Sequence, residues 1–199
     1  MGIVLEKGQN FKFEDVKNDF SLSEIKIGLG WDVNRRSGAD FDLDASAVLM
    51  SSGRLTEKGD VVYFQNKEHS SRSVRSSGDN LTGNGNGDDE VITVKLQDIP
   101  SRIDEIAFVV NIYKAIERNQ RFEFIENSYI RATDQTGKEI AKYTLHGDSF
   151  RGESAVLFGK LYRKDGSWRF KAVGESIRVG GNQVPDTLSP IMERFSQGF

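Results

Sequence analysis

The chain has 199 residues, 37% of them hydrophobic and 10% aromatic, which is enough to bury one sizeable core within a single domain. Its formal net charge of −3 argues against a nucleic-acid partner, because such a partner requires a basic face. It contains no cysteine, which excludes disulfides, thiolate metal sites and cysteine nucleophiles. We see neither an export signal nor a run of roughly 20 apolar residues, and therefore expect a soluble, cytoplasmic protein.

Apolar residues recur mostly at every second position, as at Ile25, Ile27 and Leu29, and clusters of Gly, Asn, Asp and Ser separate the runs. This period of two predicts about ten short strands. The clearest runs are 25–29, 45–50, 61–64, 92–96, 106–113, 129–133, 139–145, 155–162 and 168–173. The pattern predicts an all-β fold, a two-sheet β-sandwich.

Turn and helix signals complete this prediction. Asp165-Gly166 lies between the last two runs and predicts a two-residue hairpin, because both residues tolerate positive φ angles. Helix is expected to be minor. It is predicted around Leu96 to Ile103, and in the tail, where Ser189 can cap a short helix with Pro190 in its first turn.

The segment 78–90 is the one break in composition, and it lies between strands. It holds four carboxylates, three amides and four glycines, with no Lys or Arg. Carboxylates this close repel one another unless a cation offsets their charge. A second acidic group lies upstream at Asp32, Asp40, Asp42 and Asp44. Taken alone, such a loop is a solvated turn about as often as it is a cation site. The second acidic group favours the cation site.

Known motifs fit this segment poorly. As an EF-hand, Asp79 to Glu90 lacks oxygen side chains at Leu81 and Gly83, and Asn84 stands where glycine is required. Glycine-rich calcium repeats of β-helices need many copies, and only one is present. A phosphate-binding loop needs a following Lys and helix, and Gly28-Leu29-Gly30 lacks the third glycine of a dinucleotide fingerprint.

The ligand types favour calcium. The chain has only two histidines, His69 and His146, which are far apart in sequence, so zinc has little to bind. Glycine loops place many oxygens irregularly, which suits calcium's six to eight flexible ligands better than the strict octahedron of magnesium.

Several motifs together resemble the TerD family of bacterial tellurium-resistance and stress proteins, over roughly residues 2 to 175. They are Gly28-Leu29-Gly30-Trp31-Asp32, Phe41-Asp42-Leu43-Asp44-Ala45-Ser46, Ser77-Gly78-Asp79-Asn80-Leu81-Thr82-Gly83, Gly87-Asp88-Asp89-Glu90, Phe108-Val109-Val110-Asn111-Ile112-Tyr113, Asn127, Ile130-Arg131, the run 153–163 and the run 168–174.

The resemblance implies a cytoplasmic, calcium-binding β-sandwich with two ions close together, a role in stress and tellurite resistance, and no established catalysis. The metal ligands that it implies are Asp42, Asp44, Asp79, Asn80, Asp88, Asp89 and Glu90. If 42–44 is extended, both carboxylates face one side and Leu43 faces the core. Asp32 is a weaker candidate, and Asp40 is interpreted as a solvated loop acid.

The chain departs from the family pattern after Gly174. We therefore expect a domain at 1–175 and a divergent tail at 176–199, which packs on the same sandwich or docks a partner through Ile191, Met192, Phe195 and Phe199. The resemblance implies that the partners are other stress or tellurium-resistance proteins, and that binding can take place at the inner membrane surface. The alternatives are a metal-dependent hydrolase or phosphoesterase and a module that binds anionic lipid through calcium.

Overall fold

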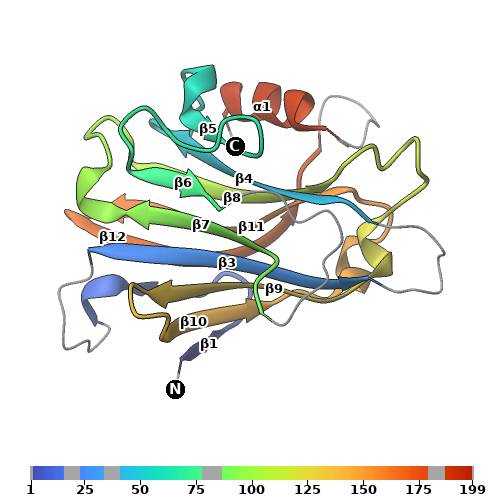
Figure 1. Cartoon of the computed structure of the whole chain (residues 1–199), viewed down its shortest axis with the longest axis horizontal. Helices are drawn as coiled ribbons and strands as arrows, with labels where there is room; N and C mark the ends of the chain where they lie inside the picture. The colour runs from blue at the N-terminus through green and yellow to red at the C-terminus, as the bar shows by residue number, and fades with distance from the viewer. Residues whose placement is uncertain (1, 16–22, 34–40, 78–86, 179–186, 199) are drawn as a thin grey trace.

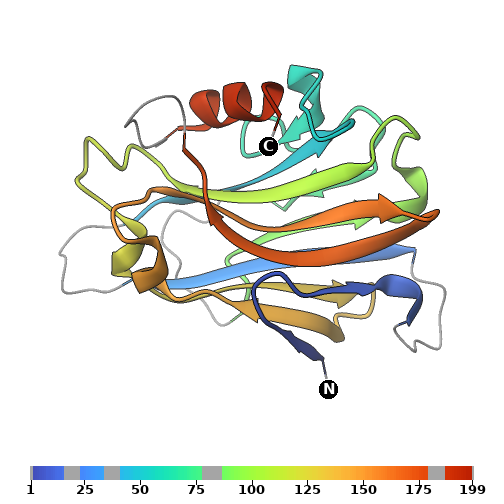
Figure 2. The same cartoon turned by 180° about the vertical axis from the view of Figure 1, so that it is seen from behind.

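The computed structural model describes residues 2–15, 23–33, 41–77, 87–178 and 187–198. Two six-stranded sheets face each other, as Figures 1 and 2 show. The predicted all-β sandwich is thus confirmed. None of the helices within these described ranges is long and apolar enough to cross a membrane.

The first sheet has the strand order β1-β10-β9-β3-β7-β6. Its strands are β1 (Ile3–Leu5), β3 (Glu24–Val33), β6 (Val74–Ser76), β7 (Glu90–Lys95), β9 (Ile125–Asp134) and β10 (Glu139–Thr144). All its neighbours are antiparallel except β1 and β10, which run parallel.

The second sheet is antiparallel throughout and has the order β2-β12-β11-β8-β4-β5. Its strands are β2 (Asn10–Lys12), β4 (Leu43–Met50), β5 (Val61–Val62), β8 (Glu105–Ile112), β11 (Ala155–Lys164) and β12 (Ser167–Ser176). The predicted hairpin joins β11 to β12, and both turn residues have positive φ, 54° at Asp165 and 77° at Gly166. This confirms the turn prediction.

Two apolar layers hold the fold together. The larger one fills the space between the sheets with alternate residues of the strands, among them Ile27, Leu43 and Phe108. The smaller one lies on the outer face of the second sheet, where α1 (Leu188–Ser196) buries Ile191 and Phe195 against β4, β5 and β8. This outer layer explains why β4 and β8 are buried on both faces.

The helical parts differ from prediction. The expected helix at 96–103 is one 3-10 turn, η4 (Leu96–Asp98), because Pro100 disfavours helical backbone at the preceding Ile99, which is extended. The tail helix begins at Leu188 after Thr187, so Ser189 is inside the helix and not its cap.

Other helical turns are short, and three strands were not anticipated. Among the described residues, the remaining 3-10 turns are η1 (Phe13–Asp15), η3 (Lys58–Asp60), η5 (Phe122–Phe124) and η6 (Gly147–Phe150). β1, β2 and β6 have three residues each, too few for a periodic signal. β5 is shorter than the predicted strand at 61–64, because Tyr63 turns back to bond with Asn66.

Candidate functional site

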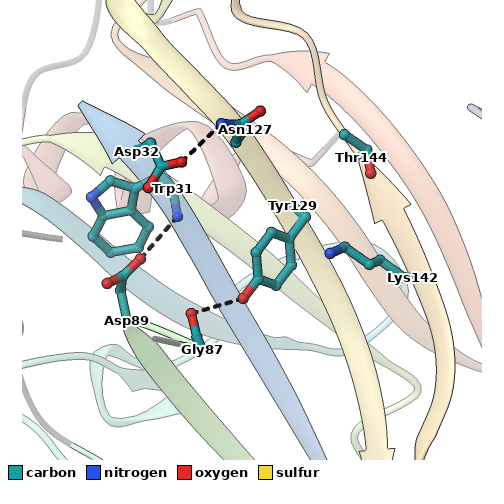
Figure 3. Close-up of a pocket in the computed structure, with 8 residues that line it drawn as sticks. All are labelled: Trp31, Asp32, Gly87, Asp89, Asn127, Tyr129, Lys142 and Thr144. Atoms are coloured by element: carbon teal, nitrogen blue, oxygen red, sulfur yellow. Dashed lines mark hydrogen bonds between the residues drawn. The ribbon is translucent and has the colours of Figure 1, made fainter. Parts of the chain in front are cut away.

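A pocket of about 470 Å³ opens on the outer face of the first sheet, where β3 ends and β7 begins (Figure 3). Strands β9 and β10 form its other side. It is lined by Trp31, Asp32, Gly87, Asp89, Asn127, Tyr129, Lys142 and Thr144. Four of these residues, Trp31, Asp32, Gly87 and Asp89, come from or directly adjoin the acidic motifs of the sequence.

Two glycines of β3 let neighbouring side chains pack closely against the strand beside this pocket. A Cβ at Gly28 would lie 2.1 Å from the Asp88 carboxylate, and a Cβ at Gly30 would lie 2.4 Å from the Tyr129 ring. Real Cβ contacts are never so short, so only glycine lets both side chains lie flat against the strand. The Gly28-Leu29-Gly30 motif is therefore a packing device for this site.

Asp88 is held by cationic and phenolic donors. Arg131 on β9 donates from Nε and an amino group to its two oxygens, at 2.7 and 3.1 Å, and the Tyr129 hydroxyl lies 3.0 Å from Oδ1. Lys142 on β10 lies over the Tyr129 ring, 3.8 Å from its centroid. Burial and the negative charge of Asp88 together raise the pKa of Tyr129, so the phenol stays protonated and donates.

Asp89 has a different environment. Its Oδ2 accepts a hydrogen bond of 2.9 Å from the Trp31 backbone N–H. Burial raises its pKa, this hydrogen bond opposes the rise, and the negative charges of Asp32 and Asp88 add to it. The Asp32 carboxylate in turn accepts from the Asn127 amide at 2.8 Å. Three carboxylates thus lie close together at this pocket, and Asp88 forms an ion pair of 2.7 Å with Arg131.

Glu90 joins the two sheets at this end. Its side chain is 3% exposed, and its Oε2 accepts a 2.9 Å hydrogen bond from the backbone N–H of Ala45 on β4. Because β7 and β4 belong to different sheets, this bond brings the two acidic segments of the sequence, 42–44 and 88–90, to the same end of the sandwich.

The predicted ligands of the upstream motif divide between two places. Leu43 faces the core, as alternation predicted. Asp42 precedes β4, and one of its carboxylate oxygens lies 3.8 Å from Arg118. Asp44 lines a separate cavity on the outer face of the second sheet, beside α1. The structure therefore does not bring Asp44 into the pocket that contains Asp89.

Two predicted ligands, Asp79 and Asn80, lie outside the described residues, and so do the loop acid Asp40 and the tail residue Phe199. Within the described ranges, no three His, Cys, Asp or Glu side chains are grouped closely enough to hold a metal ion by themselves. The sequence analysis did not select Tyr129 and Lys142. The sequence signal for them was weak: residues 129, 131 and 142 point outward from two predicted strands. That these residues lie close together is known only once the pairing of β9 with β10 is known.

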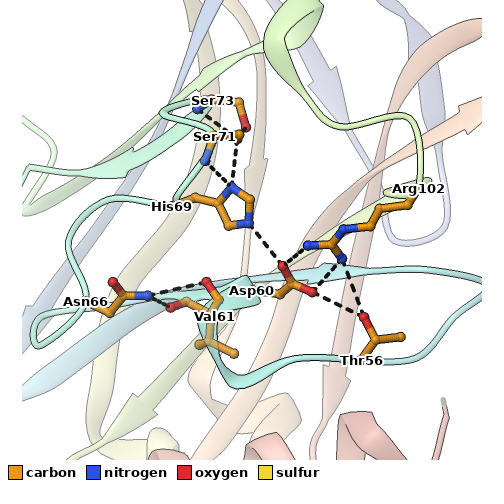
Figure 4. A network of polar contacts seen from close by, with 9 residues as sticks. Thr56, Asp60, Val61, Asn66, His69, Ser71, Ser73 and Arg102 are labelled. Carbon is orange, nitrogen blue, oxygen red and sulfur yellow. Dashed lines mark hydrogen bonds and ion pairs between the residues drawn. The ribbon is translucent and has the colours of Figure 1, made fainter.

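A second buried polar cluster lies elsewhere, between η3, the segment before β6 and the turn at Arg102 (Figure 4). Asp60, which is 1% exposed, accepts from two nitrogens of Arg102 at 2.6 and 2.7 Å, and its Oδ1 lies 3.0 Å from His69 Nε2. The backbone N–H of Ser71 donates to the other ring nitrogen. Burial alone would raise the pKa of Asp60, but the hydrogen bonds from Arg102 and His69 hold it below its ordinary value.

Fold and site together define a class of protein: a two-sheet β-sandwich that gathers carboxylates from two distant segments at one end. Comparison with known proteins gives the family. The model of the TerD domain matches residues 1–184. The chain belongs to the TerD family of tellurium-resistance and general stress proteins.

Relatives of similar length support this assignment. The chain is 42% identical to tellurium resistance protein TerD of Serratia marcescens over 182 residues, 90% of this chain and 93% of that one. It is 39% identical to stress response protein SCP2 of Bacillus subtilis over 95% of this chain and 98% of that one. A crystal structure of a TerD homologue from Streptomyces coelicolor, SCO6318, superposes with a TM-score of 0.66 at 20% identity, covering 90% and 99% of the two chains, and shows the same fold.

Proposed function

We propose that this chain is a non-catalytic, cytoplasmic stress-response protein that binds calcium at the acidic end of its sandwich. One observation carries the proposal: Asp89 is partly buried beside Asp32 and Asp88, and the pKa of its carboxyl group is raised. Carboxylates crowded together in a partly buried place are the electrostatic condition that a bound cation relieves. The relatives' names, which refer to tellurium resistance and stress response, support the cellular role.

The donor chemistry fits a hard cation. Asp32 and Asp89 would hold the ion on the pocket side, together with Asp79 and Asn80, which are assigned from sequence. Carboxylate and amide oxygens are calcium's preferred ligands. Bound calcium would supply positive charge that offsets the repulsion between carboxylates. The predicted second ion would involve Asp42 and the segment 88–90.

Neighbouring residues would support the ion on the pocket side without binding that ion themselves. Arg131 already compensates Asp88, so Asp88 orients Tyr129 and Arg131 beside the ion. Glu90 fixes β7 to β4 through its bond to Ala45, which keeps the two acidic segments together. Both histidines lie away from this pocket, which favours the non-catalytic role over a metal-dependent hydrolase.

A calcium titration of the metal-stripped protein tests the proposal. Calcium should raise the melting temperature progressively, since a ligand at 100 times its dissociation constant adds about 2.7 kcal/mol, and magnesium should have a smaller effect. Asp89→Asn keeps the acceptor for the Trp31 N–H but removes the charge, so it should abolish the calcium response. Asp148→Asn, at a side chain that is 86% exposed, is the matched control and should respond like the natural chain.

Two outcomes would contradict the proposal at different levels. If calcium leaves the melting temperature of the natural chain unchanged, calcium binding is wrong. If calcium stabilises the natural chain and Asp89→Asn equally, the protein binds calcium but the assignment of Asp89 is wrong. Partners at the membrane surface are tested separately, by sedimentation with anionic vesicles in calcium and in chelator.

A further inference from the structure

A second cavity, of about 170 Å³, lies between the outer face of the second sheet and the start of α1. Most of this face is apolar, since Val48 and Met50 on β4 and Val109 on β8 pack under α1. The end of the face nearest the cavity is polar instead. There Asp44 and Ser46 project from β4, and Asn111 projects from the paired position on β8.

Two polar side chains that line this cavity, Asn111 and Ser46, have buried atoms without hydrogen bonds among the described residues. Asn111 and Ser46 are each 1% exposed. Within the described part of the chain, neither Nδ2 nor Oδ1 of Asn111 has a hydrogen-bond partner, and the same holds for Oγ of Ser46. Buried polar groups are nearly always paired, because leaving one unpaired costs about 1–3 kcal/mol. An unpaired donor and an unpaired acceptor on one side chain indicate a ligand that carries both.

The cavity also has two poles of opposite charge. The Asp44 carboxylate, 8% exposed, supplies the negative pole. The N-cap residue Thr187 and the first two residues of α1, Leu188 and Ser189, supply the positive pole, because a helix N-terminus carries partial positive charge and backbone donors. The Thr187 side chain does not cap this first turn. A carboxylate accepts several hydrogen bonds, so Asp44 can bind an ammonium group alongside its other contacts.

An inorganic ion fits this cavity less well. A divalent cation needs six or more oxygens, and among the described residues no group of three His, Cys, Asp or Glu side chains is present. An anion would meet the charge of Asp44. The aromatic ring of Tyr63 and the apolar Leu188 and Met192 also line the cavity, and these suit an organic molecule.

We propose that this cavity binds a small zwitterionic α-amino acid, with its ammonium group on Asp44 and Asn111 Oδ1 and its carboxylate on Asn111 Nδ2 and the first turn of α1. The volume equals that of about six waters, which suits glycine, alanine or serine. The site lies on a different sheet from the pocket around Asp89 and does not depend on calcium.

Isothermal titration of the full chain with glycine, alanine and serine tests this inference, with calcium held constant. At least one amino acid should bind saturably. Ethylammonium and acetate, which carry one charge each, should bind at least about tenfold more weakly, because each leaves one pole and one Asn111 group unpaired. Absence of binding by all three amino acids would overturn the proposal, and so would equally tight binding of either fragment.

Two variants locate the site. Asn111→Leu removes both unpaired groups at similar volume and should lose binding while raising the melting temperature. Asp44→Asn keeps the shape of the side chain but removes its charge, so this variant should also lose amino-acid binding. If Asn111→Leu does not fold, Asp44→Asn alone tests the location of the site. Ser128→Ala, at a buried serine on the other sheet, should bind like the natural chain. Unchanged binding by both site variants would contradict the assignment.

Discussion

Two carboxylates of this protein, Asp60 and Asp89, show how differently one fold treats the same chemical group. Asp60 is nearly fully buried, yet Arg102 and His69 compensate it and its pKa is lowered. Asp89 is less buried, yet its carboxylate neighbours add to the effect of burial and its pKa is raised. The difference teaches that burial alone does not mark a functional carboxylate. The charges around a buried carboxyl group also decide the direction of its pKa shift, since Arg102 lowers the pKa of Asp60 and the neighbouring carboxylates raise that of Asp89.

The largest expected effect comes from breaking the compensated cluster. Asp60→Ala leaves Arg102 and the buried His69 without their shared acceptor, and should lower the free energy of unfolding by about 3 kcal/mol. Because Arg102 is 40% exposed and can hydrate, we place the loss at the lower end for buried pairs. Urea unfolding at neutral pH measures it, with the exposed Asp148→Ala as control. A loss under about 1 kcal/mol would contradict a structural role for this cluster.

The next effect concerns Gly28, on which the compensated neighbour Asp88 rests. Gly28→Ala places a methyl group where the Asp88 carboxylate lies, so the carboxylate must move and lose its bonds to Arg131 and Tyr129. We expect a loss of about 2 kcal/mol in thermal or urea unfolding. Gly59→Ala, where a Cβ meets open space, is the matched control. Equal stability of the two variants would show that Asp88 is free to move.

Two buried serines extend the comparison to neutral groups. The Ser128 hydroxyl donates to the Leu145 carbonyl, whereas the Ser46 hydroxyl has no hydrogen-bond partner among the described residues. Ser128→Ala should therefore cost about 1 kcal/mol of unfolding free energy, and Ser46→Ala should cost almost nothing. Thermal unfolding of the two variants side by side is the measurement. A larger loss for Ser46→Ala would contradict the description of the cavity beside α1.

A smaller effect of opposite sign is expected at Asp89 in chelator. Asp89→Asn removes one of the crowded charges and keeps the acceptor for Trp31, so it should raise the unfolding free energy at neutral pH by about 0.5 kcal/mol. Urea unfolding in chelator measures this, with Asp148→Asn beside it. Destabilisation by Asp89→Asn in chelator would mean that the fold itself already compensates the charge.

The pH dependence sharpens the same contrast. Asp89 has a raised pKa, so its carboxyl group holds a proton more tightly when folded, and the metal-free protein gains stability from it as pH falls from the folded pKa toward the ordinary value of 3.8. Asp60 has a lowered pKa, so its contribution is present above 3.8 and is lost as pH falls through the folded pKa.

The measurement is the difference in unfolding free energy between the natural chain and each Asn variant, taken across pH. The difference for Asp89→Asn should rise in favour of the natural chain as pH falls toward 3.8, and the difference for Asp60→Asn should shrink below 3.8. Parallel profiles for the two variants would contradict the contrast between the two carboxylates.

The sequence by itself determined the class of fold, the hairpin at Asp165-Gly166 and the family. These depend on local features: a period of two along each strand, the φ preferences of Asp and Gly, and contiguous motifs. The helix predicted at 96–103 failed for a local reason too, because the effect of Pro100 on Ile99 outweighed the periodic signal. Strands as short as β1, β2 and β6 carry too few residues to show a period.

Only the tertiary structure decided how the acidic residues are used. Strand pairing placed Arg131 and Tyr129 against Asp88, the meeting of two sheets placed Glu90 against Ala45, and α1 covered Asp44 on the opposite side of the second sheet. Contacts between residues that are 40 or more positions apart in the sequence depend on strand register, and no local pattern encodes that register. The sequence therefore located the acidic segments, and the packing of the sheets determined which charged and polar neighbours each carboxylate has.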